Sequence, residues 1–86
     1  MIDPALPSDA VATMMGERMT THGDPMDTLA RIAAMWGGYL GKDLGVADVG
    51  AMMVMLKLAR ARHGYARDHY LDAIAYTALA EDAARP

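Results

Sequence analysis

The sequence predicts an all-helical protein: a compact bundle of four helices in one domain. Apolar residues recur at spacings of three and four along most of the chain, which is the period of a helix buried on one side. β-branched residues are few and never alternate with polar ones, so strands are not expected. The 86 residues make a single small domain, 1–86, whose ends at 1–7 and 83–86 are expected to be flexible.

The first helix is expected to begin just after Pro7, with Ser8 or Asp9 as its N-cap, and to run to about Thr21. Its residues at helical spacing are Val11, Met14, Met15, Arg18 and Met19. The turn at 22–25 ends it, because Gly23 permits a left-handed cap.

The second helix is expected to follow at once, with Asp24 as N-cap and Pro25 in its first turn. Its apolar stripe consists of Met26, Leu29, Ile32, Ala33, Trp36 and Leu40. Glycines at 37 and 38 weaken the end of this helix, and residues 41–45 are expected to form a loop.

The third helix is expected to start near Asp48 and to stop at Gly64. Apolar residues cover more than half of its circumference, which predicts a central helix buried on several sides. They are Val49, Met52, Met53, Met55, Leu56, Leu58 and Ala59. The fourth helix opens at Asp68, and its predicted core face is Leu71, Ile74, Ala75, Ala78 and Leu79.

Composition narrows the classes of function. The chain is 53% hydrophobic, more than so small a domain can bury alone, which predicts burial between identical subunits in a homodimer. A net charge of -3 argues against nucleic-acid binding. No cysteine is present, which excludes thiolate metal ligands and a cysteine nucleophile. Neither a signal peptide nor an apolar run of membrane-spanning length is recognisable, so a soluble cytoplasmic protein is expected.

Two carboxylates on the last helix suggest the most specific functional hypothesis, which is a metal site. Asp68 and Asp72 are four residues apart and therefore share one face of a helix, where they repel unless a cation lies between them. A magnesium ion bound by these carboxylate oxygens and by substrate phosphates would remove this repulsion. The alternative is structural: Asp68 is an N-cap, and Asp72 forms an ion pair with Arg60 or Lys57 of the third helix.

Five further residues are candidates for the same site. Asp24 and Glu17 are possible carboxylate ligands for the metal, and His22 is a candidate for proton transfer or substrate binding. Lys57 and Arg60 lie one turn apart and would neutralise phosphate charge. The alternatives are a capped turn for residues 22–25, a solvated surface position for Glu17, and a side chain of Lys57 that reaches the surface.

The chain resembles small all-helical proteins of tailed phages and prophages that are classed as a domain of unknown function. The resemblance covers roughly residues 17–81 and rests on five motifs. They are His22-Gly23-Asp24-Pro25, Trp36-Gly37-Gly38-Tyr39-Leu40-Gly41, Asp48-Val49, Met53 with Lys57 and Arg60, and Asp68-His69-Tyr70-Leu71-Asp72 with Tyr76. It implies a protein that acts in the cytoplasm of an infected or lysogenic bacterial host.

More distantly, the last helix is similar to that of the all-alpha nucleotide pyrophosphohydrolases, the MazG and dUTPase-like group. That resemblance implies a magnesium-dependent reaction on nucleotide phosphates and assembly into dimers or tetramers. This chain departs from the pattern because position 20, three residues after Glu17, is Thr20 rather than a second acidic residue. The rival hypothesis is a non-enzymatic phage protein that binds and inhibits a host protein.

Overall fold

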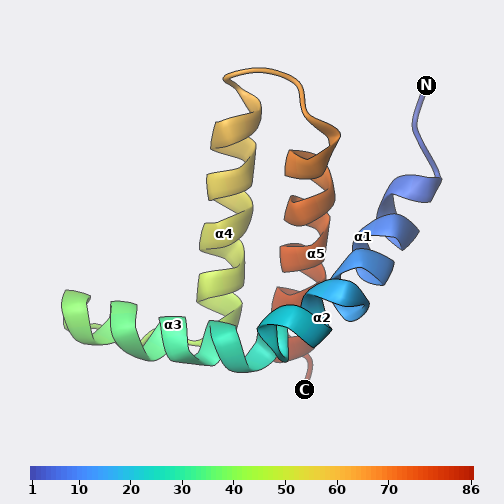
Figure 1. Ribbon diagram of the computed structural model, residues 1–86. Coiled ribbons are helices and arrows are strands. Elements are labelled where there is room, and N and C mark those ends of the chain that lie inside the picture. The colour runs from blue at the N-terminus through green and yellow to red at the C-terminus, as the bar shows by residue number, and fades with distance from the viewer.

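The computed structural model describes the backbone of residues 1–86 and every side chain except that of Glu17. Its helices are α1 (Ala5–Met15), α2 (Glu17–His22), α3 (Pro25–Leu40), α4 (Val46–Ala61) and α5 (Arg67–Ala84) (Figure 1). The all-helical prediction is confirmed, and the described residues contain no strand. The four predicted helical segments occur in the predicted order, with the first divided at Gly16 into α1 and α2.

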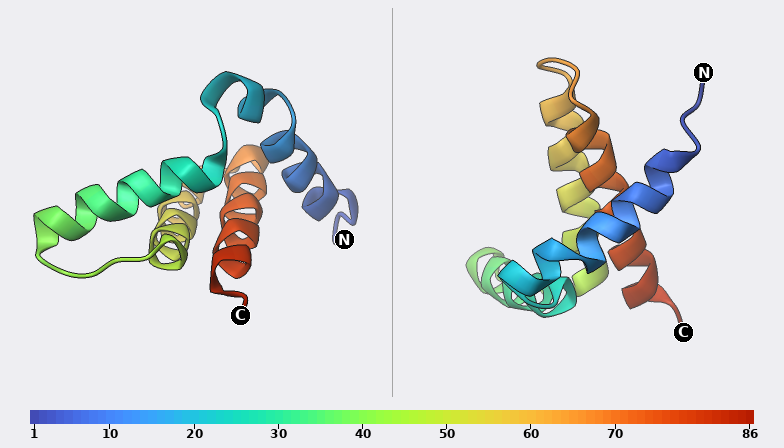
Figure 2. Two further views of the ribbon diagram at one scale, coloured as in Figure 1. Left: turned by 90° about the horizontal axis from the view of Figure 1, so that it is seen from below. Right: turned by 45° about the vertical axis from the view of Figure 1, so that its right-hand side comes forward.

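The helices are arranged around a hairpin. Helices α4 and α5 lie side by side and antiparallel, joined by the loop that Figure 1 shows at the top. Helix α1 crosses α5, as the right-hand view of Figure 2 shows. Helix α3 runs across the opposite end of the hairpin, beside the start of α4, and its C-terminal half projects beyond the hairpin (Figures 1 and 2). The molecule is accordingly longer in one direction, with extents of 43 × 29 × 27 Å.

The start of α1 differs from the prediction. The helix begins at Ala5, so Ser8 and Asp9 lie inside it and neither is the N-cap. The carboxylate of Asp3 instead accepts a hydrogen bond from the Ala5 amide at 2.9 Å, which satisfies one of the free amides at the helix start. Asp9 pairs with Arg67 at 2.7 Å, and Asp3 pairs with the same guanidinium at 3.2 Å, so this end of α1 is tied to the start of α5.

Helix α3 has the bounds that its sequence predicts. Asp24 is the N-cap, and its Oδ1 accepts a hydrogen bond from the Met26 amide at 2.9 Å, with Pro25 in the first turn. The helix ends at Gly41, whose φ of +67° is left-handed and whose amide donates to the Gly37 carbonyl. A residue with a Cβ would be strained there, which explains why glycine follows the helix.

The first turns of α4 and α5 hold the predicted acidic residues. Helix α4 starts at Val46, and Asp48 reaches back from its first turn to accept the Gly45 amide at 2.9 Å. Helix α5 starts at Arg67 with Ala66 in the N-cap position, so Asp68 is not the N-cap that the structural alternative proposed. Both carboxylates still lie at the positive end of a helix dipole.

Two small groups of buried side chains form the core. One consists of Leu29, Ala33, Val49 and Leu79 and joins α3 to the hairpin. The other consists of Ala10, Leu71 and Ala75 and joins α1 to α5. Met14 packs against both groups, so this methionine links the two halves of the core.

Helices α4 and α5 lie close together at Gly50. A Cβ at this position would lie 2.8 Å from the Cβ of Ala80 and 3.2 Å from the Tyr76 carbonyl oxygen. We expect Gly50→Ala to lower the free energy of unfolding by about 1–3 kcal/mol, because the two helices must separate to admit the methyl group. This loss opposes the roughly 1 kcal/mol that alanine gains over glycine inside a helix. Urea denaturation of both proteins measures the difference.

A double variant provides the control for this prediction. Ala80→Gly removes the nearest atom, so Gly50→Ala should cost less in that background than in the wild type. Equal costs in the two backgrounds would show that the close approach of the helices does not limit the size of residue 50.

Candidate functional site

Asp72 is the centre of a polar network inside the bundle. It is the buried charged residue among the described side chains, and it is only 8% exposed. Its Oδ1 accepts a hydrogen bond from the guanidinium of Arg18 in α2 at 2.8 Å. Its Oδ2 lies 3.0 Å from the ammonium of Lys57 in α4. One carboxylate therefore connects three helices, with one cation on each oxygen.

The two cations keep Asp72 ionised. Burial has the largest effect on this carboxyl and raises its pKa, but the hydrogen bonds from Arg18 and Lys57 and their positive charges outweigh it. The pKa of Asp72 therefore lies below its usual value. The hydrogen bond to Asp72 likewise raises the pKa of Arg18 and outweighs the opposing effect of burial, with smaller contributions from the charges of Asp72 and Asp68.

A cleft of about 240 Å³ opens beside this network. It lies between α2, the first turns of α3 and the middle of α5. Most of its lining is apolar, and Asp72, Arg18 and His22 supply charged or titratable groups. The full lining is Met14, Arg18, Met19, His22, Gly23, Pro25, Thr28, Leu29, Ile32, Asp72, Ala75, Tyr76 and Leu79.

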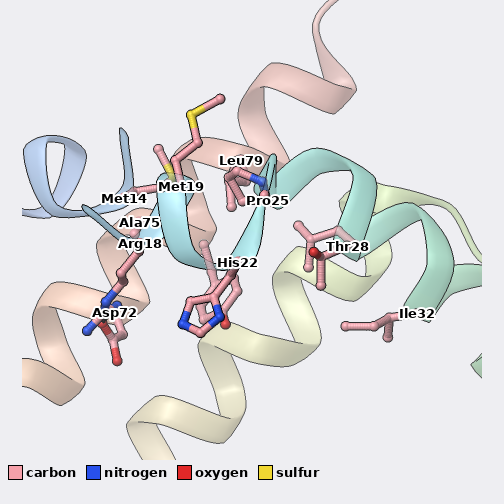
Figure 3. Close-up of a pocket in the computed structure, with 13 residues that line it drawn as sticks. Met14, Arg18, Met19, His22, Pro25, Thr28, Ile32, Asp72, Ala75 and Leu79 are labelled. Atoms are coloured by element: carbon pink, nitrogen blue, oxygen red, sulfur yellow. Dashed lines mark hydrogen bonds and ion pairs between the residues drawn. The ribbon is translucent and has the colours of Figure 1, made fainter. Parts of the chain in front are cut away.

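Figure 3 shows how these side chains are distributed. Arg18 and Asp72 lie together at one end of the cleft, and Ile32 lies at the other, with His22 between them. Met19 lies at the edge of the cleft and is 38% exposed. The cleft thus has a charged end and an apolar wall containing two methionines, a side chain that adapts its shape to what it contacts.

The predicted metal ligands are not gathered at one point in this arrangement. Asp24 caps α3, Asp68 is exposed in the first turn of α5, and Asp72 is held by its two cations. The side chain of Glu17 lies outside the described residues. Among the side chains that are described, no three acidic or histidine residues converge to hold a metal ion.

The predicted binding residues are divided in a similar way. Lys57 turns inward to Asp72, which is one of the two ion pairs expected as a structural alternative. Arg60, the other expected partner, is exposed one turn further along α4. His22 is the last residue of α2 and is exposed at the cleft. Of the predicted set, the cleft therefore brings together His22 and Asp72, with Lys57 behind the carboxylate.

Sequence reasoning assigned no role to Arg18. The signal was present, because Arg18 falls within the apolar stripe of the first predicted helix. A charged residue on a core-facing stripe requires a buried partner, since an unpaired buried charge is costly. What the sequence alone does not reveal is that the partner lies 54 residues away.

Comparison with known proteins shows that the sequence of this chain is similar to phage proteins. Residues 6–84 match a family described as a domain of unknown function (DUF6378). The gene 55 protein of Mycobacterium phage D29 is 34% identical over 74 residues, which cover 85% of this chain and 49% of the relative. The gene 55 protein of Mycobacterium phage L5 is 37% identical over 68 residues, covering 77% of this chain and 44% of the relative.

The chain spans about half the length of the curated relatives it matches. No solved structure matches it. In the part of the chain that the structure describes, no helix combines the length and the apolar character needed to cross a membrane.

Proposed function

The chain is a helical phage protein that belongs to the family described as a domain of unknown function (DUF6378), and on that premise we propose that it acts by binding a host protein rather than by catalysis. The observation that supports this is the state of Asp72. Its two oxygens are paired with Arg18 and Lys57, so the buried acidic residue of the last helix serves the fold. We place the action of the protein in the cytoplasm of the infected host.

The cleft is the proposed contact site for the host protein. Its volume of about 240 Å³ lies below the range of roughly 300–1,000 Å³ typical of small-molecule pockets. It is instead suited to one large apolar side chain of a partner protein, the kind of anchor that dominates many interfaces. Met19 and Ile32 would contact that side chain, while Arg18 and His22 would meet polar groups around it.

Affinity capture from a Mycobacterium lysate with the tagged chain tests the proposal. We expect one host protein at a stoichiometric amount and expect Met19→Glu to weaken its capture at least tenfold, because the carboxylate would have to be buried in the cleft. Tyr65→Glu, at an 81% exposed position in the loop between α4 and α5, is the matched control and should leave capture unchanged. Loss of binding in both variants, or in neither, would show that the cleft is not the contact site.

A second candidate is the magnesium-dependent hydrolysis of nucleotide phosphates. It is supported by the position of Asp68 one turn before Asp72 on α5, close enough for its charge to act on Arg18. It requires Arg18 and Lys57 to release Asp72 to a metal. Incubation with nucleoside triphosphates and magnesium or manganese, with pyrophosphate as the readout, tests it, and turnover would replace the binding proposal.

A further inference from the structure

Positive charge is concentrated where α4 is joined to α5. Residues 60–70 hold three of the eight lysine and arginine residues but only one of the eleven acidic residues, which gives this segment a charge of +2. The rest of the chain, with five cations and ten acidic residues, has a charge of -5. The net charge of -3 argues against nucleic-acid binding for the chain as a whole, but it conceals this separation of charge.

Arg60 and Arg62 are the cations of this segment that have no acidic partner among the described side chains. Both are exposed at the C-terminal end of α4, and neither forms an ion pair with a described residue. Arg67, by contrast, pairs with Asp3 and Asp9. These two carboxylates lie on the side of α5 where α1 packs, whereas the two arginines belong to α4 on its other side (Figures 1 and 2).

Two exposed tyrosines belong to the same segment. Tyr65 in the loop is 81% exposed, and Tyr70 in the first turn of α5 is 39% exposed. Their rings are stacked, with centroids 6.3 Å apart and planes inclined by 28°. The contact with Tyr70 orients the ring of Tyr65 and still leaves most of it in solvent. Exposed aromatic rings beside cationic side chains are the elements with which proteins bind single-stranded nucleic acids.

We propose that this end of the hairpin binds single-stranded nucleic acid, with a base stacked on Tyr65 and phosphates paired with Arg60 and Arg62. A single strand supplies both kinds of contact, because its backbone is anionic and each of its bases presents an aromatic face. An acidic protein would pair with the arginines but would leave the tyrosines without a stacking partner. A duplex would do the same, since its bases are stacked on one another.

The site is small, which sets the expected strength of binding. Two arginines neutralise two phosphates, whereas Asp68, exposed in the first turn of α5, repels a strand. The logarithm of the affinity should therefore fall with the logarithm of the salt concentration with a slope of about -1.4. The site is independent of the proposed function, because the cleft uses none of residues 60–70.

Fluorescence anisotropy with short labelled oligo(dT) and oligo(U), on the full 86-residue chain at low salt, tests the site. We expect both strands to bind, since stacking and phosphate pairing are common to DNA and RNA; binding of only one would identify that one as the ligand. Tyr65→Ala should weaken binding at least about fivefold, whereas Tyr65→Phe keeps the ring and should bind like the wild type. Arg62→Gln should reduce the steepness of the salt dependence by about 0.7.

Tyr39→Ala and Arg31→Gln are the matched controls. Tyr39 is 90% exposed and Arg31 is also exposed, and both belong to α3, which crosses the other end of the hairpin. Neither change should alter the affinity, and the far-ultraviolet circular dichroism of all variants should match that of the wild type. Failure of the wild type to bind either strand would overturn the proposal. So would equally tight binding of a duplex or of polyglutamate, a Tyr65→Ala variant that binds like the wild type, or a control that weakens binding as much as its counterpart.

Discussion

Asp72→Asn is expected to lower the free energy of unfolding by about 3–5 kcal/mol, the range found when one partner of a buried ion pair is removed. The asparagine keeps the size of the side chain but loses its charge. Arg18 can turn towards solvent, because its side chain is already 51% exposed. Lys57 cannot do so as easily, because its side chain is only 15% exposed and its charge would remain buried without a partner. Urea denaturation measures the loss, which is a large share of the roughly 5–15 kcal/mol that stabilises a typical domain.

A double variant separates the loss of the pair from the loss of packing. Asp72→Leu combined with Lys57→Met replaces both buried partners with apolar residues of similar size. This double variant loses the ion pair but leaves no buried ammonium at position 57 without a partner. Such replacements are often neutral or stabilising, so we expect the double variant to be more stable than Asp72→Asn. A single variant that unfolds at the same urea concentration as the wild type would refute the role assigned to Asp72.

The effect of Asp72→Asn should depend on pH. Because the pKa of Asp72 is lower in the folded protein than its usual value of 3.8, ionised Asp72 stabilises the fold above that value. This contribution is lost as the pH falls below about 4 and through the lower pKa of the folded state. The stability difference between wild type and Asp72→Asn should therefore be constant near neutral pH and shrink in acid.

Leu29→Ala is expected to destabilise the protein by about 2–5 kcal/mol. Leu29 is 2% exposed and packs in the group of buried side chains that joins α3 to the hairpin. Truncation loses apolar burial and leaves a cavity that helices crossing at the end of a hairpin cannot readily close. In a domain of this size such a loss lowers Tm by at least about 8 °C, which calorimetry can measure.

Leu29→Met is the control for the cavity, because it keeps most of the side-chain volume and should cost less than about 1.5 kcal/mol. All of these proteins must be compared at one concentration, since self-association would add to their apparent stability. An alanine variant that melts within a degree of the methionine variant would mean that the group around Leu29 does not hold α3 in place.

The sequence predicts the helices better than it predicts their ends. The bounds of α3 follow from local chemistry, because Asp24, Pro25 and Gly41 act on the backbone beside them. The start of α1 was misplaced because two residues, Asp3 and Ser8, can each satisfy amides at a helix start, and packing decides between them. Where competing caps are close together, the sequence alone does not select one.

The candidate site was less predictable than the helices. The spacing of Asp68 and Asp72 correctly placed both on α5, but it could not tell which of them would be buried. The pairing of Lys57 with Asp72 was among the expected alternatives because adjacent antiparallel helices bring their middle turns together. Arg18 and the cleft depend on where α2 lies relative to α5, and no short-range pattern specifies that placement.

The two ion pairs of Asp72 differ in the conformational entropy that the unfolded chain must lose to form them. Lys57 and Asp72 are 15 positions apart in the sequence, whereas Arg18 and Asp72 are 54 apart. The entropy lost on closing a loop grows with the logarithm of its length, so the Arg18 contact must offset about 1 kcal/mol more than the Lys57 contact. Lys57 therefore strengthens a hairpin that is already local, while Arg18 carries the larger entropic cost of bringing the N-terminal helices onto it.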